Sequence, residues 1–321
     1  MVILNRREIE ALIDMPSASD EIAEAFRAAS RGDVNLPPVG HISFPPIQAD
    51  CHIKYGHLEG DAQFVIKVAT GFPLNSASGL PTGNGVSLVL SAETGAVEAV
   101  LHDEMVMTDI RTGIAGALAT RALAREDAQQ VLIVGTGVQA LRQIESHRAL
   151  IGEHLRFTVW GRSSAKCNAV VAQVPTPGTI AVSTDLAQSV READIVVTAT
   201  GAIEPLIDSD WVQPGTHITA VGADAPGKQE LATALVARAD LLVTDSLAQC
   251  LDHGEVSHAH REQRLDTRHT TELGTLLADG HNGRTRDDQI TLADLTGIAA
   301  QDIAIAQHVL SAWHAKHPHA S

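Results

Sequence analysis

Residues Val131 to Ala140, with the sequence VLIVGTGVQA, constrain the fold of this chain more than any other stretch. Val131 to Val134 are typical of a buried parallel strand, and Gly135, Gly137 and Ala140 then follow the G-x-G-x-x-G/A spacing that opens a helix. The first glycine allows a tight turn, the second lets the backbone approach a phosphate, and the small third residue lets the helix pack on the strand. The free N–H groups of the helix face the anion. The stretch therefore predicts a place for a pyrophosphate.

The context of this stretch favours a dinucleotide site over an ordinary strand–turn–helix. An amphipathic helix follows it, and a second apolar strand, 157–160, comes about 20 residues later, as a dinucleotide-binding unit requires. From residue 131 onward strands and helical stretches alternate, with strands predicted at 131–134, 157–160, 179–182, 195–198, 217–221 and 241–244. The alternation predicts an α/β fold with a Rossmann-type doubly wound parallel sheet, in which ligands lie at the carboxyl ends of the strands.

The N-terminal third follows a different pattern. Strands at 51–54, 64–69, 86–90 and 96–101 have no helical crossovers between them, which predicts an antiparallel sheet in a smaller α+β domain. Helices are predicted at 6–15 after Asn5, from Ser19 or Asp20 onward, and after Asp109, while the proline-rich stretch 36–46 is expected to break regular structure. A last helix, 302–313, is expected to return to the first domain. The predicted domains are therefore 1–112 with 300–321, and 113–299.

Two basic residues in or beside the first domain are candidates for binding an anion. Lys67 lies inside the apolar strand 64–69, where a buried ammonium needs an anion, although strand alternation could also turn it to solvent. Arg111 stands early in a helix, where the helix dipole does not favour a cation. It either binds an anion from outside or pairs with Asp103, Glu104 or Asp109.

Two loops at the carboxyl ends of predicted strands carry further candidates. Thr200 and Gly201 follow the fourth strand of the second domain, and Val221 and Asp224 stand at the end of the fifth. Asp224 is thus expected near the nicotinamide end of a bound cofactor, which makes it a candidate catalytic residue. A simple turn is the alternative, because Asp-x-Pro suits one.

The residues after the second strand of this domain bear on the identity of the cofactor. An NAD site normally carries an acid there, which accepts hydrogen bonds from the ribose. This chain has Gly161, Arg162 and Ser163 instead, and an arginine with serines can bind a 2′-phosphate that a carboxylate would repel. NADP(H) is therefore favoured, with NAD(H) as the alternative. The residues expected to contact the cofactor are Gly135, Thr136, Gly137, Val138, Gln139, Gly161, Arg162, Ser163, Thr200, Gly201 and Val221.

Composition excludes several classes of partner. The chain has 23 basic and 39 acidic residues, a net charge of −16 that is spread along its length and would repel nucleic acid and anionic membranes. Cys51, Cys167 and Cys250 form no CxxC pair and are typical of reduced thiols in the cytosol. No signal peptide and no apolar run of about 18 residues is present, so a soluble cytoplasmic protein is expected. Among the 16 histidines, the run 258–260 and those of the tail are interpreted as solvated, and no metal site is predicted.

Taken together, five segments resemble the ornithine cyclodeaminase and mu-crystallin family over nearly the whole chain. They are FVIKVATGFP (64–73), TDIRTGIAGALAT (108–120), VLIVGTGVQA (131–140), AVGADAPGKQEL (220–231) and DDQITLADLTGIAAQDIAIA (287–306). The resemblance implies an N-terminal substrate-binding and dimerisation lobe, completed by the C-terminal helix, beside a Rossmann domain, and hence a homodimer. It also implies that Lys67 and Arg111 bind the carboxylate of a small imino or amino acid, and that Asp224 is the general acid/base.

The resemblance does not fix the reaction, because the family includes cyclodeaminases, alanine dehydrogenases and NADPH-dependent ketimine reductases. Two departures bear on this choice. The Gly161–Ser163 segment resembles the mu-crystallin arrangement, which uses NADPH, whereas cyclodeaminases tend to hold NAD. Lys54 stands about where cyclodeaminases place a glutamate that faces the distal amine, and a lysine would repel ornithine. An arginine that the family often has in the proline-rich stretch is missing, with Gly40 and His41 near its place.

Three hypotheses for the function result. The first is NADPH-dependent reduction of a 2-imino acid, Δ1-pyrroline-2-carboxylate or Δ1-piperideine-2-carboxylate, to proline or pipecolate, with Lys67, Arg111 and Lys54 at the substrate. The second is ornithine cyclodeamination, which releases ammonia with no net change in the cofactor. The third is a crystallin-like protein that binds NADPH without useful turnover.

Overall fold

The computed structural model describes residues 1–175, 180–279 and 283–318 of the chain. Two units divide these residues: Met1–Arg111 with Ile298–Ser321 form unit 1, and Thr112–Gly297 form unit 2. The division drawn from the sequence lies within two residues of these bounds. Within the described ranges, no helix combines the length and the apolar character that crossing a bilayer demands.

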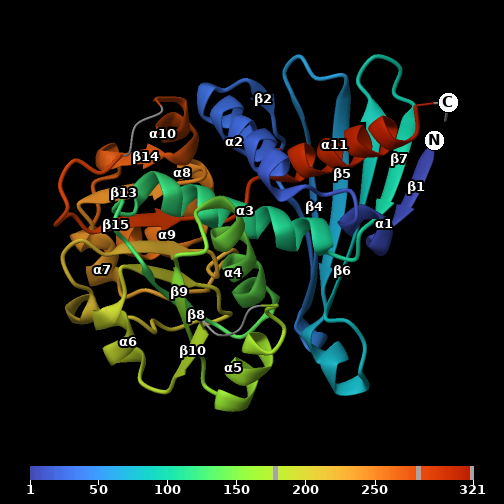
Figure 1. Ribbon diagram of the computed structural model, residues 1–321. Coiled ribbons are helices and arrows are strands. Elements are labelled where there is room, and N and C mark those ends of the chain that lie inside the picture. Colours follow the sequence, from blue (N-terminus) through green and yellow to red (C-terminus); the bar gives the residue numbers. More distant parts are fainter. Residues whose placement is uncertain (176–179, 280–282, 319–321) are drawn as a thin grey trace. The chain divides into compact units, whose positions relative to one another are not determined.

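Unit 1 is built on a mixed sheet whose strands follow the order β1-β7-β6-β5-β4-β2, with β3 paired to β4. The pairs among β4, β5, β6 and β7 are antiparallel, as predicted, but β1 pairs in parallel with β7. Figure 1 shows the long helices α2 and α11 together over one face of this sheet. The elements are β1 (Val2–Asn5), α1 (Arg6–Glu10), α2 (Met15–Arg31), β2 (Val34–Asn35), β3 (Gly40–Phe44), η1 (Pro45–Ile47), β4 (Ala49–Leu58), β5 (Gln63–Gly71), η2 (Pro73–Ser78), β6 (Gly83–Ser91), β7 (Val97–His102), the start of α3 (Val106–Leu123) and α11 (Ala299–Lys316).

Several helix boundaries in unit 1 differ from the prediction for local reasons. Asn5 does cap a helix, with a complete capping box to Glu8, but that helix ends at Glu10 rather than at residue 15. Helix α2 begins at Met15 because Asp14 caps it, so Ser19 and Asp20 lie within it. The start of the last helix moves from 302 to Ala299, which places its acidic residue in the first turn.

Two further corrections concern segments next to the candidate site. The stretch 36–46 does not simply break structure, because β3 within it pairs with β4. Helix α3 starts at Val106, so Asp109 lies in its first turn and is not its cap. The acid that meets the start of α3 is Asp103, whose side chain accepts a hydrogen bond from the Met107 amide at 3.0 Å. Arg111 consequently lies in the second turn, where the dipole argument for an external anion is weaker.

Unit 2 contains a parallel eight-stranded sheet with the order β10-β9-β8-β11-β12-β15-β13-β14. All six predicted strands are present, although position 179 lies outside the described residues, and β14 and β15 were not predicted. The elements are β8 (Gln130–Val134), α4 (Val138–Leu150), β9 (Arg156–Trp160), α5 (Ser164–Val171), β10 (Ile180–Ser183), α6 (Leu186–Glu192), β11 (Ile195–Thr198), η4 (Ser209–Trp211), β12 (His217–Ala220), α7 (Thr233–Arg238), β13 (Leu241–Thr244), α8 (Leu247–Asp252), α9 (Glu255–Arg261), η5 (Thr267–His269), β14 (Thr270–Glu272), α10 (Leu273–Asp279) and β15 (Thr291–Asp294).

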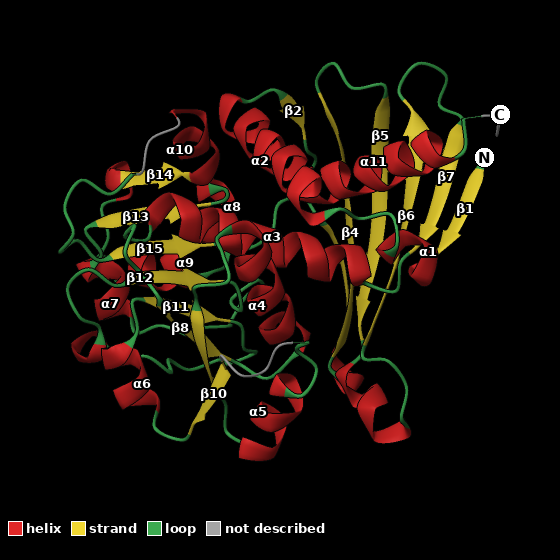
Figure 2. Ribbon diagram, viewed as in Figure 1, coloured by secondary structure: helices red, strands yellow, loops and turns green. Residues whose placement is uncertain are grey.

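Two cores, one on each face of this sheet, confirm the doubly wound architecture. Alternate residues of β8 point to opposite faces: Ile133 packs with α4 and α5, and Leu132 packs with α6 and α7. Figure 2 shows these two pairs of helices on either side of the strands. The chain leaves β8 toward one face and β11 toward the other, so the crevice expected for a ligand opens at the carboxyl ends of these two neighbouring strands.

Candidate functional site

A groove of about 600 Å³ lies at the carboxyl ends of β8, β9 and β11 in unit 2. It gathers seven of the residues predicted to contact a cofactor: Gly135, Thr136, Gly137, Gly161, Arg162, Thr200 and Gly201. Its remaining lining, which was not predicted, consists of Trp160, Ala199, Ala202, Ile203, Glu204 and Leu206. The groove thus joins three loops that are far apart in the sequence.

The glycines of the first loop fit the roles that the spacing predicts for them. Gly135 has φ +141°, and a Cβ there would lie 2.5 Å from the Ala199 carbonyl oxygen, so the turn requires glycine. Gly137 caps α4 with extended backbone, and a Cβ on it would meet nothing within 4 Å. That open space in front of the helix N-terminus is where a pyrophosphate would lie, so the residues present fit a dinucleotide.

The other four predicted cofactor residues are not among the residues that line this groove. Val138 is the half-exposed first residue of α4, and Gln139 follows it. Ser163 caps α5 with its hydroxyl, and buried Val221 donates its amide to the Thr198 carbonyl. The Arg162 side chain is exposed and makes no hydrogen bond or ion pair within the part of the chain that the structure describes, so it can bind a ligand anion.

A buried glutamate that sequence reasoning missed ties two of these loops together. Glu230 accepts hydrogen bonds from the Thr200 amide at 2.6 Å, the Thr198 hydroxyl at 2.7 Å and the Gly222 amide at 2.9 Å. Burial raises the pKa of Glu230, and the three donors oppose that rise. Its own backbone amide donates to Glu255, another buried acid, at 2.7 Å. Glu230 therefore fixes the loops after β11 and β12 relative to each other.

Asp224 lies on the second of these loops, at an exposed position. Its carboxylate accepts a hydrogen bond from the Lys228 ammonium at 2.5 Å, and both side chains are accessible to solvent. The pair is therefore accessible from solvent.

In unit 1, Lys67 and Arg111 converge on one carboxylate. Lys67 Nζ lies 2.9 Å and Arg111 Nε 3.0 Å from Oδ1 of Asp302, which stands in the first turn of α11. Arg111 also donates to the side chain of Gln301 at 2.8 Å. All three charged side chains are less than 8 % exposed. Lys67 is therefore buried with an anion, and the alternative in which it faces solvent is wrong. The alternative in which Arg111 pairs with one of three nearby acids is also wrong, because its partner is Asp302.

The charges in this cluster determine one another's ionisation. Burial raises the pKa of Asp302, but the positive charges of Lys67 and Arg111 outweigh burial and hold the pKa well below its usual range. Burial also lowers the pKa of the Lys67 ammonium, and the Asp302 charge opposes that effect. Lys54 is the cross-strand neighbour of Lys67 and adds a third positive charge that acts on Asp302.

Four buried polar atoms around this cluster have no hydrogen-bond partner among the described residues: Asp302 Oδ2, Gln301 Nε2, Asp103 Oδ1 and Ser87 Oγ. Ser87 lies opposite Lys67 in the sheet, and the charge of Asp103 acts on Lys67. Burying such atoms unpaired is costly, whereas a polar ligand or water can satisfy them. Donors also remain on the cations, because Asp302 takes only one of the three N–H groups of Lys67 and the recorded bonds of Arg111 use only Nε and one Nη.

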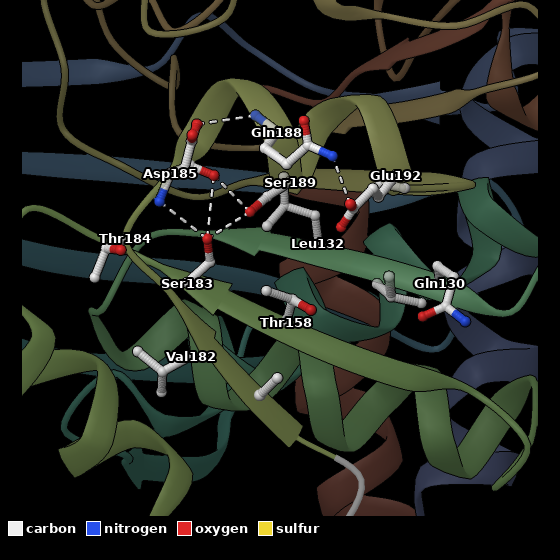
Figure 3. A pocket seen from close by; sticks show the side chains of 13 residues that line it. Gln130, Leu132, Thr158, Val182, Ser183, Thr184, Asp185, Gln188, Ser189 and Glu192 are labelled. Atoms are coloured by element: carbon white, nitrogen blue, oxygen red, sulfur yellow. Dashed lines mark hydrogen bonds between the residues drawn. The ribbon is translucent and has the colours of Figure 1, made fainter.

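A second hollow in unit 2, of about 370 Å³, lies between α6 and the sheet (Figure 3). The Ser189 hydroxyl oxygen lies 2.6 Å from the Ser183 hydroxyl and 2.7 Å from the Asp185 carbonyl oxygen, so the start of α6 forms a polar corner of this hollow. None of the predicted site residues lines this hollow.

The fold and these sites together define a two-unit protein with a Rossmann-type dinucleotide domain and a separate buried cluster of charged residues. Residues 1–317 match the profile of the ornithine cyclodeaminase/mu-crystallin family. The chain is 39 % identical over 312 residues to the uncharacterized cyclodeaminase y4tK of Sinorhizobium fredii, covering 95 % of this chain and 94 % of that protein. The chain therefore belongs to the ornithine cyclodeaminase/mu-crystallin family, as its motifs predicted.

Two solved structures share the fold over almost the whole chain. An archaeal alanine dehydrogenase dimer with bound NAD is 31 % identical, with a TM-score of 0.89, and the match covers 99 % of this chain and 97 % of that one. The Δ1-pyrroline-2-carboxylate reductase of Thermococcus litoralis, in complex with NADH and L-proline, is 26 % identical, with a TM-score of 0.91 and coverage of 99 % and 98 %. The relatives of this chain thus include oxidoreductases and a cyclodeaminase, which supports an enzymatic role.

Proposed function

We propose that this protein is an NADP(H)-dependent reductase of a 2-imino acid, most simply Δ1-pyrroline-2-carboxylate or Δ1-piperideine-2-carboxylate, giving L-proline or L-pipecolate. The observation that carries the proposal is the cluster of Lys67, Arg111 and Asp302, in which buried donors remain for a carboxylate. The reductase described above holds NADH and L-proline, and the alanine dehydrogenase holds NAD, which supports a nicotinamide cofactor and an amino-acid or imino-acid substrate. By analogy, unit 1 binds the substrate and mediates assembly of a cytoplasmic homodimer, and unit 2 binds the cofactor.

In this proposal Lys67 and Arg111 hold the substrate carboxylate and fix the position of the imine carbon. A substrate carboxylate joins Asp302 between the cations, and Lys54 supplies further positive charge. The bound nicotinamide supplies the hydride that the imine carbon accepts. Asp224 orients the Lys228 ammonium, and this pair delivers or stabilises the proton at the imine nitrogen.

The preference for NADP(H) over NAD(H) rests on Arg162. Its exposed guanidinium lines the groove, and the segment 161–163 after β9 contains no acid to repel a 2′-phosphate. Glu204, which also lines the groove, belongs to the loop after β11. A charge-assisted hydrogen bond is worth about 1.5–3 kcal/mol, so Arg162→Gln should raise the KM for NADPH by roughly 10- to 100-fold. The KM for NADH should change less than about threefold. An equal effect on both cofactors would refute this part of the proposal.

The reaction is tested by following cofactor oxidation at about 340 nm with each cyclic imine, NADPH and NADH in parallel. We expect rapid oxidation by the parent protein and a loss of at least 100-fold in kcat/KM for Lys67→Met and Asp224→Asn. The exposed Asp210 offers a matched control, and Asp210→Asn should keep full activity. Near-parental turnover in both Lys67→Met and Asp224→Asn would overturn the assignment.

Ornithine cyclodeamination is the second candidate, because the relative at 39 % identity is named a cyclodeaminase. Lys54 beside Lys67 disfavours it, since two ammonium groups at the substrate would repel the distal amine of ornithine. Release of ammonia from ornithine, with NAD present and without net cofactor reduction, would establish cyclodeamination instead. Tight NADPH binding with no reaction on either substrate would favour a crystallin-like binding protein.

A further inference from the structure

We propose that His41, Asp50 and His52 form a binding site for one divalent transition-metal ion, such as Zn²⁺ or Co²⁺, on the β3–β4 hairpin of unit 1. The site shares no residue with the cluster of Lys67, Arg111 and Asp302, and its test does not depend on the proposed reaction. The expectation that the protein has no metal site rested only on the histidines of 258–260 and of the tail.

The strand register brings the three side chains to one face of the hairpin. His41 of β3 lies directly opposite His52 of β4, and opposed residues of an antiparallel pair point to the same side. Asp50 and His52 are two residues apart on β4, so they also share a face. Three ligands suited to transition metals thus meet on one surface, although the two histidines are 11 positions apart in the sequence.

The potential ligand atoms of the three side chains lie close enough for side-chain rotation to bring them onto one ion. One potential ligand atom from each residue lies within 4.8 Å of the other two, and His52 Nε2 is 3.4 Å from Asp50 Oδ2. With metal–ligand bonds of about 2.0–2.1 Å, two ligand atoms 3.4 Å apart subtend roughly 110° at the ion, the tetrahedral value.

The two imidazole rings lie close together in a stacked arrangement, with centroids 4.7 Å apart and an interplanar angle of 30°. At least one ring must therefore turn before both can direct a nitrogen at the same ion. Because His41 is exposed, rotation of its side chain can supply the movement of up to about 1.4 Å that closes the widest pair.

The chemistry of the ligands favours a borderline cation over calcium or magnesium. Two imidazole nitrogens and one carboxylate suit Zn²⁺, Co²⁺ or Ni²⁺, whereas the hard cations prefer oxygen ligands alone. Lys54, two residues further along β4, acts electrostatically on His52, and its positive charge disfavours the binding of a metal cation nearby. We therefore expect micromolar rather than nanomolar affinity, with water at the remaining coordination positions.

The test is titration of the full chain, purified without an affinity tag, with Co²⁺ followed by its visible absorption bands and with Zn²⁺ by calorimetry. We expect one site in the parent protein that is weakened at least tenfold in His41→Gln, His52→Gln and Asp50→Asn. His102→Gln is the matched control, because His102 is an exposed histidine on another strand of the same sheet, and it should bind like the parent.

Two results would overturn the proposal. One is unchanged affinity and stoichiometry in His52→Gln and His41→Gln, which would place the metal on other histidines. The other is the absence of binding by the parent protein at metal concentrations up to about 1 mM. Because His41 is exposed, its variant should fold like the parent by circular dichroism, so loss of binding in it reports on the ligand itself.

Discussion

Replacing Asp302 by asparagine tests whether the buried charge cluster holds unit 1 together. The substitution keeps the size of the side chain but removes the only negative charge that contacts Lys67 and Arg111 among their recorded hydrogen bonds and ion pairs. Both cations are more than 90 % buried, so water cannot replace the lost carboxylate without rearrangement. The folded state should therefore lose much of its electrostatic stabilisation.

The magnitude can be worked from the two contacts. At an effective dielectric constant of about 20, charges separated by about 4 Å attract by roughly 4 kcal/mol, and asparagine retains only a weak dipolar part of that. Removing one partner of a buried ion pair costs about 3–5 kcal/mol, because the remaining charge is uncompensated. We expect Asp302→Asn to lower the free energy of unfolding of unit 1 by about 3–5 kcal/mol.

The assay uses the position of Trp313 on the same helix as Asp302. In a background with Trp160→Phe and Trp211→Phe, urea unfolding followed by tryptophan fluorescence reports on α11 and hence on unit 1. Asp33→Asn is the control, because Asp33 forms an exposed pair with Arg31 and should cost less than about 1 kcal/mol. A loss below about 1 kcal/mol in Asp302→Asn would refute the reasoning, since the cations would then have other counter-charges.

Three further predictions follow from unit 2. Gly137→Ala should leave the free energy of unfolding within about 0.5 kcal/mol but weaken cofactor binding at least tenfold by calorimetry, because its Cβ enters empty space in the groove, whereas Gly135→Ala should destabilise the fold itself. Glu230→Gln should weaken cofactor binding and lower the free energy of unfolding by about 1–3 kcal/mol, because an amide cannot accept all three hydrogen bonds, and unchanged values of both would contradict its role. Burial lowers the pKa of His217 from 6.5 to about 3. Between these two pH values the imidazole is protonated in the unfolded state but neutral in the folded state, so the free energy of unfolding should decrease as the pH drops below 6.5. The variant His217→Gln should show a shallower fall in denaturant midpoints between pH 6.5 and 4.

The parts of this structure that the sequence predicts are those with local signals. The six apolar strands from residue 131 onward and the glycine spacing at Gly135 and Gly137 depend on neighbouring residues alone, and the structure confirms both. Strand β15 is also fully buried, but its short TLAD segment lies within a polar stretch, so its position in the middle of the sheet has no local signal. The predicted helix starts differ from the observed ones where several acids or serines near the start could each be the capping residue. Examples are the start of α2, which Asp14 caps, and the start of α3, where Asp103 accepts a backbone hydrogen bond.

In the candidate site, too, only the residues with a local sequence signal could be predicted. A lysine in an apolar strand predicts that some anion meets it, and the structure bears this out at Lys67. The anion itself, Asp302, is 235 residues away in the sequence, and its start-of-helix position resembles that of any acid in a first turn. Only the folding of α11 back onto β5 brings the two together, so no pattern around Asp302 marks it.

Glu230 and Asp302, the two site residues that the sequence did not predict, share one physical property. Both are buried acids whose partners are donors from segments distant in the chain, and burying a charge is favourable only after those partners are in place. Their stabilisation is therefore a property of the assembled fold and not of any window of sequence. Asp302 differs from Glu230 in one respect: its Oδ2 atom has no partner among the described residues, whereas both oxygens of Glu230 are satisfied. Glu230 is accordingly complete as a structural anchor, whereas the cluster at Asp302 retains a polar atom that the substrate of the proposed reaction, or water, would satisfy.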